Sequence, residues 1–304
     1  MIHKYFSNGT TWLDIEWPTK EDMTHVRDEH NIDPVIIENL LTKSPRQKIE
    51  RRGDCIYMVL HFPAHKHSHS KDTKQEVDIV LGKNFIITTR YDTIDSLHHF
   101  AKKFEVETIL NKQDSVNPLG VVFLRLMKEL YRSLSDEFAY MQNLLDDIEQ
   151  TIFLGKEKEM VKELSNVNHI LLDFKKVLIS HREVLEALVE HSNRQLGDDF
   201  DFYSRAVFRE YTKAYTTMES QLEFLGELRK TNDSLLTTKQ NEIMKTLTVI
   251  AIIALPITVI SSILQINTTD RPFVGQPHDF FIITGMMLSI AVLLFGYFKY
   301  KKWL

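Results

Sequence analysis

Four histidines crowd one short polar stretch of the sequence. His61, His65, His67 and His69 fall within the run HFPAHKHSHSKD, where serine and lysine separate them and no carboxylate precedes Asp72. Neutral imidazoles at such spacing can bind zinc or nickel. A polar, lysine-containing tract is also typical of a solvated connection between strands, and we favour that interpretation. A cytosolic metal sensor with His65, His67 and His69 as ligands is the alternative.

A second group of polar side chains recurs along an apolar, uncharged segment near the C-terminus. Read at alternating steps of three and four residues, one stripe carries Asn241, Met244, Thr248, Ala251, Leu255, Thr258 and Ser262. This spacing places the stripe on one face of a helix, and the other positions are mainly valine and isoleucine. A polar face meets protein or water while an apolar face meets lipid. A helix-packing seam and a pore lining both fit. Pro256 predicts a bend or a freed carbonyl in this helix.

No pattern typical of an enzyme stands out. There is no nucleophile with a base, no glycine-rich phosphate loop and no paired-carboxylate site, so we expect neither catalysis nor a cofactor. The single cysteine, Cys55, excludes an intrachain disulfide framework and lies in an apolar run, as a core residue would. The formal charge of −5 argues against nucleic-acid binding, which needs a concentrated basic face. A mild acidic excess is compatible with handling cations.

Two uncharged segments, residues 246–264 and 280–298, predict membrane spans. A helix rises ~1.5 Å per residue and needs about 20 apolar residues to cross the hydrocarbon layer. Two such segments in succession at a chain end disfavour a buried core helix. We therefore expect an integral membrane protein in contact with lipid.

Lysines flank the two predicted spans on one side only. Lys239 and Lys245 precede the first span and three lysines lie in the tail 299–304, whereas the connection 265–279 carries one arginine and no lysine. The positive-inside rule then predicts that both termini are cytoplasmic and that the connection is external. The N-terminus lacks the apolar core of a secretory signal, so the N-terminal portion is expected in the cytosol.

The residues before the spans predict three parts. Residues 1–116 contain β-rich runs and short helical segments, which predict an α/β domain with helices packed on a mixed sheet. Residues 117–200 predict an antiparallel helical hairpin that turns at Gly155. Residues 201–264 predict one stalk helix that continues into the first span, a rod of roughly 90 Å. Such a rod buries its apolar stripe by packing with copies of itself, so we expect a homo-oligomer.

Local signals place two elements of the N-terminal part more closely. The strand-like runs 77–81 and 85–89 flank Gly82-Lys83-Asn84, which predicts a hairpin. Asp33-Pro34 predicts the start of a helix that Ser44-Pro45 ends.

The run NEIMKTLTVIAIIALPITVISSI, residues 241–263, closely resembles the membrane-entry signature of CorA-type divalent metal ion transporters. The resemblance extends to PRQKIERRGDCIYMVLHF, VDIVLGKNFIITTR and the terminal KKWL, and so covers nearly the whole chain. It implies an α+β membrane protein of the cytoplasmic membrane, a funnel-shaped homopentamer with two transmembrane helices per subunit. Five first spans would line a central pore and the second spans would face lipid. The implied cargo is Mg²⁺, with Co²⁺ and Ni²⁺ as further candidates.

The same resemblance assigns roles to individual residues. The hallmark Gly-Met-Asn at the outer end of the first span reads Gln265-Ile266-Asn267 here, so only the asparagine is kept. A ring of Asn267 amide oxygens would hydrogen-bond hydrated Mg²⁺ without stripping its water. Gln265 adds a second ring of amides, reshapes the mouth so that transport fails, or leaves specificity unchanged. The implied pore lining and gate comprise Thr258, Leu255, Ala251, Thr248, Leu247, Met244 and Asn241.

Two departures from the family pattern concern regulation and ion identity. Members commonly carry an acidic pair in an Arg-Asp-Val-x-Asp stretch of the stalk, where magnesium binds between subunits, but here those positions are Ala206 and Arg209. Neither supplies an oxygen ligand, so ion sensing should occur elsewhere or weakly. The loop NTTDRPFVGQPHDFF looks more like that of the ZntB-like zinc branch. A proton-coupled Zn²⁺ transporter and a nonconducting membrane scaffold or sensor are therefore the alternatives.

Overall fold

The computed structural model describes residues 2–7, 9–65, 74–110, 117–196, 199–266, 274–275, 277–301 and 303. Within it the chain forms two compact units, Met1–Arg229 and Lys230–Leu304. The long helix α6 (Phe200–Gln265) contributes residues to both units.

The first unit is built on a six-stranded mixed sheet with strand order β1-β2-β6-β5-β4-β3. The strands are β1 (Ile2–Ser7), β2 (Thr10–Glu16), β3 (Lys48–Arg52), β4 (Cys55–Pro63), β5 (Lys74–Leu81) and β6 (Phe85–Arg90). All neighbours are antiparallel except β2 and β6, which are parallel. The predicted hairpin at Gly82-Lys83-Asn84 is confirmed, since β5 and β6 pair in antiparallel register across it.

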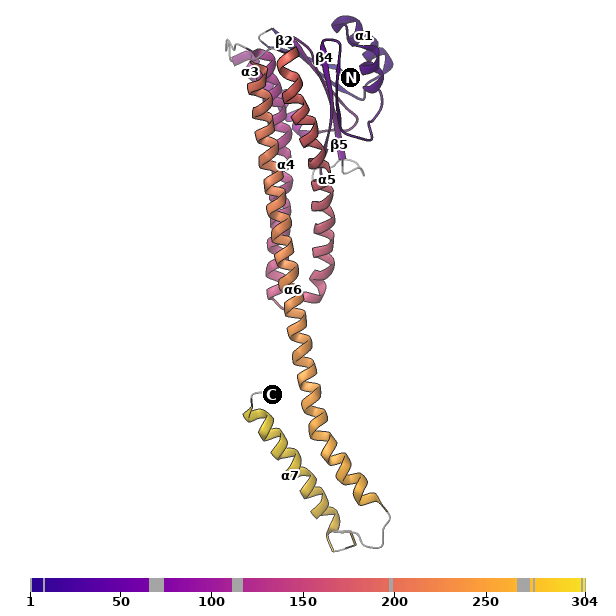
Figure 1. The fold of residues 1–304 in the computed structure, drawn as a ribbon, viewed down its shortest axis with the longest axis vertical. Coiled ribbons are helices and arrows are strands. Elements are labelled where there is room, and N and C mark those ends of the chain that lie inside the picture. The colour runs from indigo at the N-terminus through magenta and orange to yellow at the C-terminus, as the bar shows by residue number, and fades with distance from the viewer. Residues whose placement is uncertain are drawn as a thin grey trace. The chain divides into compact units, whose positions relative to one another are not determined.

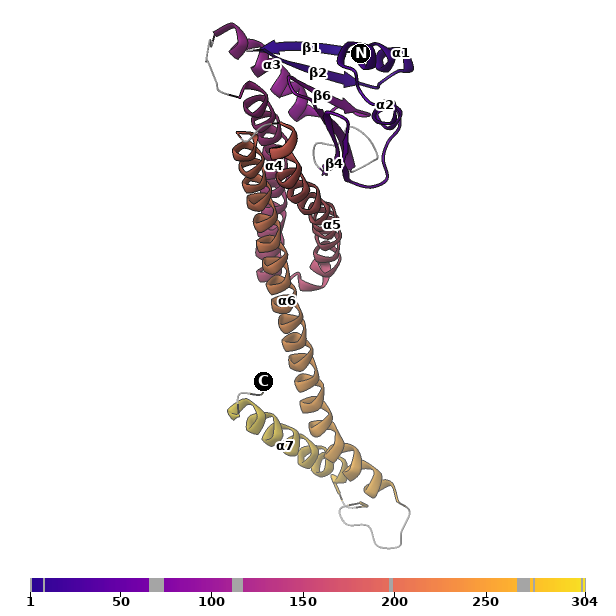
Figure 2. The same cartoon turned by 45° about the horizontal axis from the view of Figure 1, so that its top comes forward.

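Helices cover both faces of this sheet (Figure 2). On one face, α1 (Lys20–His30) and α2 (Pro34–Asn39) share a core with inward-facing strand residues such as Leu13, Tyr57 and Val80. Asp33 caps α2 by accepting from the backbone N–H of Val35, which confirms the predicted helix start. The helix ends at Asn39, before the predicted stop at Ser44-Pro45.

The opposite face is covered by α3 (Asp95–Leu110) and by three long helices, of which the first two make the main contacts with the strands. These are α4 (Pro118–Phe153), α5 (Glu157–Gln195) and the first part of α6. The turn between α4 and α5 contains Gly155 at φ 88°, a left-handed conformation that glycine adopts without strain. The sheet and the helical hairpin, which the sequence suggested as successive parts, share one continuous hydrophobic core.

Helices α4 and α6 lie side by side in this unit (Figure 1). Phe123 and Phe200 stack with ring centroids 5.5 Å apart, and Gln221 Nε2 donates to the carbonyl oxygen of Phe138 at 2.7 Å. A Cβ added to Gly120 would lie 2.2 Å from Tyr203 Cδ2, so the helices approach closely where α4 has no side chain.

A buried histidine joins α4 and α5 to the sheet. His181 Nε2 lies 2.8 Å from the carbonyl oxygen of His61, and Tyr131 Oη lies 2.8 Å from His181 Nδ1. Because a carbonyl only accepts, Nε2 carries the proton and the Tyr131 hydroxyl donates to Nδ1. Burial lowers the pKa of His181 to about 4, so the ring is neutral near pH 7.

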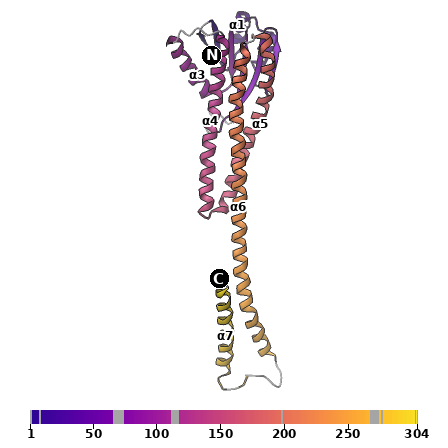
Figure 3. The same ribbon diagram turned by 60° about the vertical axis from the view of Figure 1, so that its left-hand side comes forward.

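The second unit holds the rest of α6 and the helix α7 (Asp279–Tyr300). Both helices are long and apolar enough to cross a membrane, with mean hydropathy of 2.5 and 2.2 over their most apolar windows. Figure 3 shows α7 running back alongside the end of α6. Helix α6 continues through Pro256 without ending, although Pro256 has no N–H for the carbonyl of Ile252.

Candidate functional site

One side of the membrane-spanning part of α6 is covered within the second unit and the other is open. The covered or half-covered positions are Val249, Ile253, Pro256, Ile257, Ile260 and Leu264, with Ser261 at the margin of this side. On α7 the corresponding positions are Ile283, Thr284, Met287, Ile290, Ala291, Leu294 and Phe298. Both sets repeat at three- and four-residue spacing, as expected for the facing sides of two packed helices.

The stripe predicted from the sequence lies on the open side of α6. Asn241, Met244, Thr248, Ala251, Leu255, Thr258 and Ser262 are all exposed in the single chain. At ~100° per residue, this set lies on the side of the helix opposite to the one that α7 covers. The stripe is therefore free to meet either other copies of the chain or water.

The stripe has apolar and polar levels. Met244 and Leu255 in the stripe are exposed by 61% and 63%, and Leu247 beside the stripe by 55%, so large apolar side chains stand out from the helix at two levels. Between and beyond them lie Thr248 and Thr258. Such a face alternates large apolar side chains with hydroxyl groups along the helix.

The hydroxyl protons of the two threonines in this stripe are engaged within the helix. Thr248 Oγ1 donates to the carbonyl oxygen of Met244 at 2.7 Å, and Thr258 Oγ1 donates to that of Ala254 at 2.6 Å. Such bonds to the preceding turn are common for threonine in membrane helices. What each hydroxyl presents outward is its lone pairs, which accept hydrogen bonds.

Helix α6 ends at the predicted outer mouth. Gln265 is its last residue and is exposed, and Ile266 is 57% exposed directly after it. Gln265 Nε2 donates to Ser261 Oγ at 3.3 Å, one turn earlier. Asn267, the strongest site residue predicted from the sequence, lies outside the described residues.

The histidine cluster is only partly described, since His67 and His69 also lie outside the described residues. His61 is engaged elsewhere: its Nε2 lies 3.1 Å from the carbonyl oxygen of Ser44 and 3.4 Å from Glu76 Oε2. The ring of His65 stacks at 6.3 Å on Tyr140. Among the described residues, no three His, Cys, Asp or Glu side chains converge as metal ligands. The metal-sensor interpretation of His65, His67 and His69 stays a hypothesis.

The two stalk positions at which family members commonly carry the acidic pair are Ala206 and Arg209 in this chain. The first is buried and the second is exposed. Ala206 is 5% exposed in the first unit, so a carboxylate there would be buried. Arg209 is exposed. The nearby Arg205 pairs with Asp201 at 2.7 Å on the preceding helical turn.

A cavity of about 310 Å³ lies between α3, α4 and the ends of β4 and β5. Charges of both signs line it, among them Asp95, Asp136 and Glu137 against Arg132 and Lys103. The Lys103 ammonium already pairs with Glu129 at 2.8 Å. Mixed charges of this kind, without converging ligands in the described part of the chain, do not form a metal centre within one subunit.

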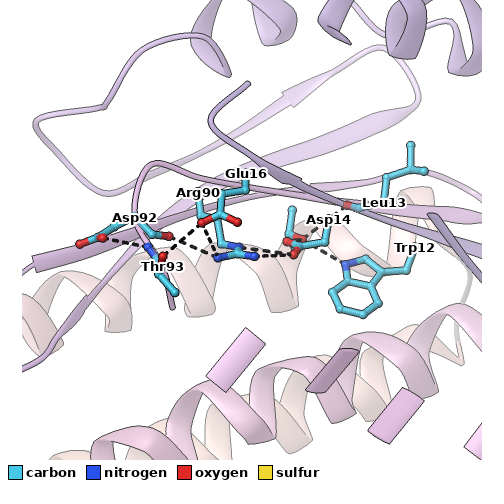
Figure 4. Close-up of polar contacts among 8 residues, drawn as sticks. Trp12, Leu13, Asp14, Glu16, Arg90, Asp92 and Thr93 are labelled. Atoms are coloured by element: carbon cyan, nitrogen blue, oxygen red, sulfur yellow. Dashed lines mark hydrogen bonds and ion pairs between the residues drawn. The ribbon is translucent and has the colours of Figure 1, made fainter. Parts of the chain in front are cut away.

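A polar cluster inside the sheet was not predicted from the sequence. Figure 4 shows Arg90 between Asp14 and Glu16, with Arg90 Nη2 3.1 Å from Asp14 Oδ2 and Arg90 Nη1 3.3 Å from Glu16 Oε1. Asp14 Oδ1 accepts from the hydroxyl of Thr88, which in turn accepts from the indole of Trp12. Arg90 pairs with both carboxylates, so this cluster joins the parallel strands β2 and β6 in the interior of the sheet.

Comparison with known proteins identifies the family. The model of the family described as CorA-like Mg²⁺ transporter protein matches residues 7–301. The chain is 25% identical over 304 residues to the cobalt/magnesium transport protein CorA of Thermotoga maritima, across 98% of this chain and 84% of that one. It is 18% identical to the zinc transport protein ZntB of Yersinia enterocolitica, across 96% and 88%.

The fold is also similar to a solved structure, the CorA magnesium transporter from Methanocaldococcus jannaschii. The TM-score is 0.82 at 19% identity, and the match covers 99% of this chain and 93% of that one. The sheet with its helices, the long α6 and the two apolar C-terminal helices are thus the architecture of that fold. Since the family model spans nearly the whole chain, this protein is a member of the CorA-like Mg²⁺ transporter family.

Proposed function

We propose that this chain carries divalent metal cations, Mg²⁺ first among them, across the cytoplasmic membrane through a pore formed by several copies of α6. The observation that carries the proposal is the open stripe of α6, which alternates hydroxyl and apolar levels opposite the side that α7 covers. Lipid chains cannot donate hydrogen bonds to the hydroxyl groups of Thr248 and Thr258, whereas water along a central axis can. Membership of the transporter family supports the same function.

The proposed pore is the centre of a homopentamer with both termini in the cytoplasm. At the outer mouth, a ring of Asn267 amide oxygens accepts hydrogen bonds from the water shell of the ion. Mg²⁺ releases water reluctantly, so contact through its water shell is the mode of recognition that costs least. Thr258 supplies the next polar ring.

Gating is assigned to the apolar levels of the stripe. Leu255 forms one constriction, and Met244 with Leu247 forms another above Asn241. A narrow apolar ring closes a pore by expelling water, so no charged gate is required. The inside-negative potential drives entry, contributing ~2.3 kcal/mol per charge per 100 mV and about twice that for a divalent ion.

A flux assay on the purified chain in liposomes tests the proposal. Mg²⁺ entry that follows the membrane potential without a pH gradient is the expected result. Asn267→Ala should abolish that entry because the ring of amide oxygens is lost. Wild-type flux that survives in Asn267→Ala would remove the assignment of the mouth, and the absence of wild-type flux for any ion would leave a nonconducting scaffold or sensor.

Proton-coupled Zn²⁺ transport is the second candidate. It is favoured by the external loop NTTDRPFVGQPHDFF and by the similarity to a zinc transport protein. In the same liposomes, Zn²⁺ entry stimulated by a pH gradient, with no Mg²⁺ entry, would establish this candidate in place of the first. Either result keeps the chain among transporters and outside the enzymes.

A further inference from the structure

Two side chains in the last turn of α6, Gln265 and Ser261, are in contact. Their contact determines which end of the Gln265 amide faces the proposed pore. Gln265 continues the three- and four-residue spacing of the open stripe, three residues after Ser262. It therefore lies on the side of the helix away from α7 and is exposed. Ser261, one turn below, is only half-exposed and lies off the stripe.

The contact between these residues places the amide nitrogen, and not the amide oxygen, against Ser261. Gln265 Nε2 donates to Ser261 Oγ at 3.3 Å. A primary amide carries two donors on nitrogen and two lone pairs on oxygen, and the two ends lie on opposite sides of the group. Holding the nitrogen against Ser261, off the stripe, leaves the oxygen Oε1 for whatever occupies the open side.

An outward oxygen suits a hydrated cation. Water molecules bound to a small divalent ion turn their oxygens to the metal and their hydrogens outward, so a surface that surrounds them must accept hydrogen bonds. An amide nitrogen facing the pore would place its N–H donors against the O–H donors of the ion's water shell. Thr248 and Thr258 show the same arrangement, since their hydroxyl protons bond to carbonyl oxygens of their own helix.

We propose that Ser261 is a positioning residue that holds the Gln265 amide nitrogen away from the pore, so that a ring of Gln265 Oε1 atoms accepts hydrogen bonds from the water shell of an entering divalent cation. This assignment rests on the proposed function and deepens it. It makes Gln265 a specificity-determining residue for ions that keep tightly held water, and it gives Ser261 a role although Ser261 itself does not face the pore.

The test measures initial rates of Mg²⁺ entry against Mg²⁺ concentration for the full-length chain in liposomes. Gln265→Met keeps the length of the side chain and removes the amide. One lost hydrogen bond to an ion's water shell corresponds to roughly a five- to tenfold rise in KM. The maximal rate should stay near that of the wild type, because the change weakens capture of the ion at the mouth and leaves the rest of the pore intact.

Ser261→Ala releases the amide nitrogen and should raise KM by about threefold, in keeping with loss of one weak hydrogen bond. Ser261→Thr keeps the acceptor and should restore the wild-type value. The decisive variant is the double substitution: in the Gln265→Met background, Ser261→Ala should have no further effect on KM, because its only target is gone. Ser289→Ala, on α7, removes a hydroxyl that bonds only to its own helix and is the matched control.

The outcomes separate this inference from the function it rests on. Wild-type flux with an unchanged KM in Gln265→Met overturns the role of Gln265 and leaves the proposed function standing. A KM effect of Ser261→Ala that persists in the Gln265→Met background overturns the positioning role of Ser261. Absence of wild-type flux overturns the proposed function and this assignment with it.

Discussion

Among the single residues of the sheet, Asp78 on β5 is a carboxyl group held in the protein interior. It is fully buried, and its Oδ2 lies 3.3 Å from the hydroxyl of Tyr57 and 3.5 Å from that of Tyr91. Glu76 lies beside it on the same face of the strand and contacts the ring of His61. Burial, and then the neighbouring carboxylate Glu76, raise the pKa of Asp78 well above its ordinary value.

This raised pKa predicts how stability depends on pH. Above the ordinary aspartate pKa the folded chain binds more protons than the unfolded chain, so the free energy of unfolding falls as pH rises through the folded pKa. The slope reaches at most about 1.4 kcal/mol per pH unit. Asp78→Asn should flatten this decline above the ordinary aspartate pKa. Thermal unfolding of the detergent-solubilised chain, followed at several pH values, measures this.

Asp54→Asn is the control for that experiment, because Asp54 is exposed and pairs only with Lys83 at the surface. The unfolding free energy of Asp54→Asn should change with pH in parallel with that of the wild type. If the pH dependence of Asp78→Asn is also parallel to that of the wild type, the extra proton bound by the folded chain is not on Asp78. The sequence did not reveal this group, since VDIVLG shows one polar residue in an apolar strand and its tyrosine partners lie 21 and 13 residues away.

Among the helices and strands, the sequence predicted the features that depend on residues close together in the chain. The hairpin at Gly82-Lys83-Asn84 and the start of α2 at Asp33-Pro34 depend on turn and cap chemistry within a few residues, and both are present. The parallel pairing of β2 with β6 could not be predicted in this way. It joins Thr11 to Phe85 across the intervening helices and strands, and no local signal specifies a partner so distant.

The close approach of α4 and α6 is another pairing that only the structure reveals, and it yields a prediction. A Cβ at Gly120 would lie 2.2 Å from Tyr203 Cδ2 and 2.7 Å from Cγ, near the base of the ring, where rotation gives little relief. Gly120→Ala should therefore push the helices apart and reduce the free energy of unfolding by about 1–3 kcal/mol.

A matched glycine on α6 makes that experiment specific. Gly226 lies inside α6 with no atom within 4 Å of an added Cβ, so Gly226→Ala should stabilise the helix by roughly 0.5–1 kcal/mol. Denaturant or thermal unfolding compares the two variants. Tyr203→Ala should relieve the clash in Gly120→Ala, and equal effects of the two glycine substitutions would show that helix propensity, not the contact with Tyr203, governs both.

Within the described residues of a single chain, one side of α6 in the second unit stays uncovered. The open stripe of α6 exposes Met244 and Leu255 together with Thr248 and Thr258, and neither water alone nor lipid alone suits that mixture. The periodicity of the stripe was readable from the sequence because it repeats within one helix. Whether it faces a pore or a seam depends on other copies, which the sequence of one chain does not contain.

The chain's single cysteine provides a clean test of the assembly. Cys55 is buried and burial raises the pKa of its thiol to about 11, so it forms little thiolate and background crosslinking should be low. In a ring around the stripe, Leu255→Cys brings thiols of neighbouring copies together at the constriction, and mild oxidation in membranes should yield a disulfide-linked dimer. Leu293→Cys, on an exposed face of α7 away from α6, should remain monomeric because its neighbour is lipid. Crosslinking of Leu293→Cys with none of Leu255→Cys would place α7 at the axis and reverse the arrangement proposed for the pore.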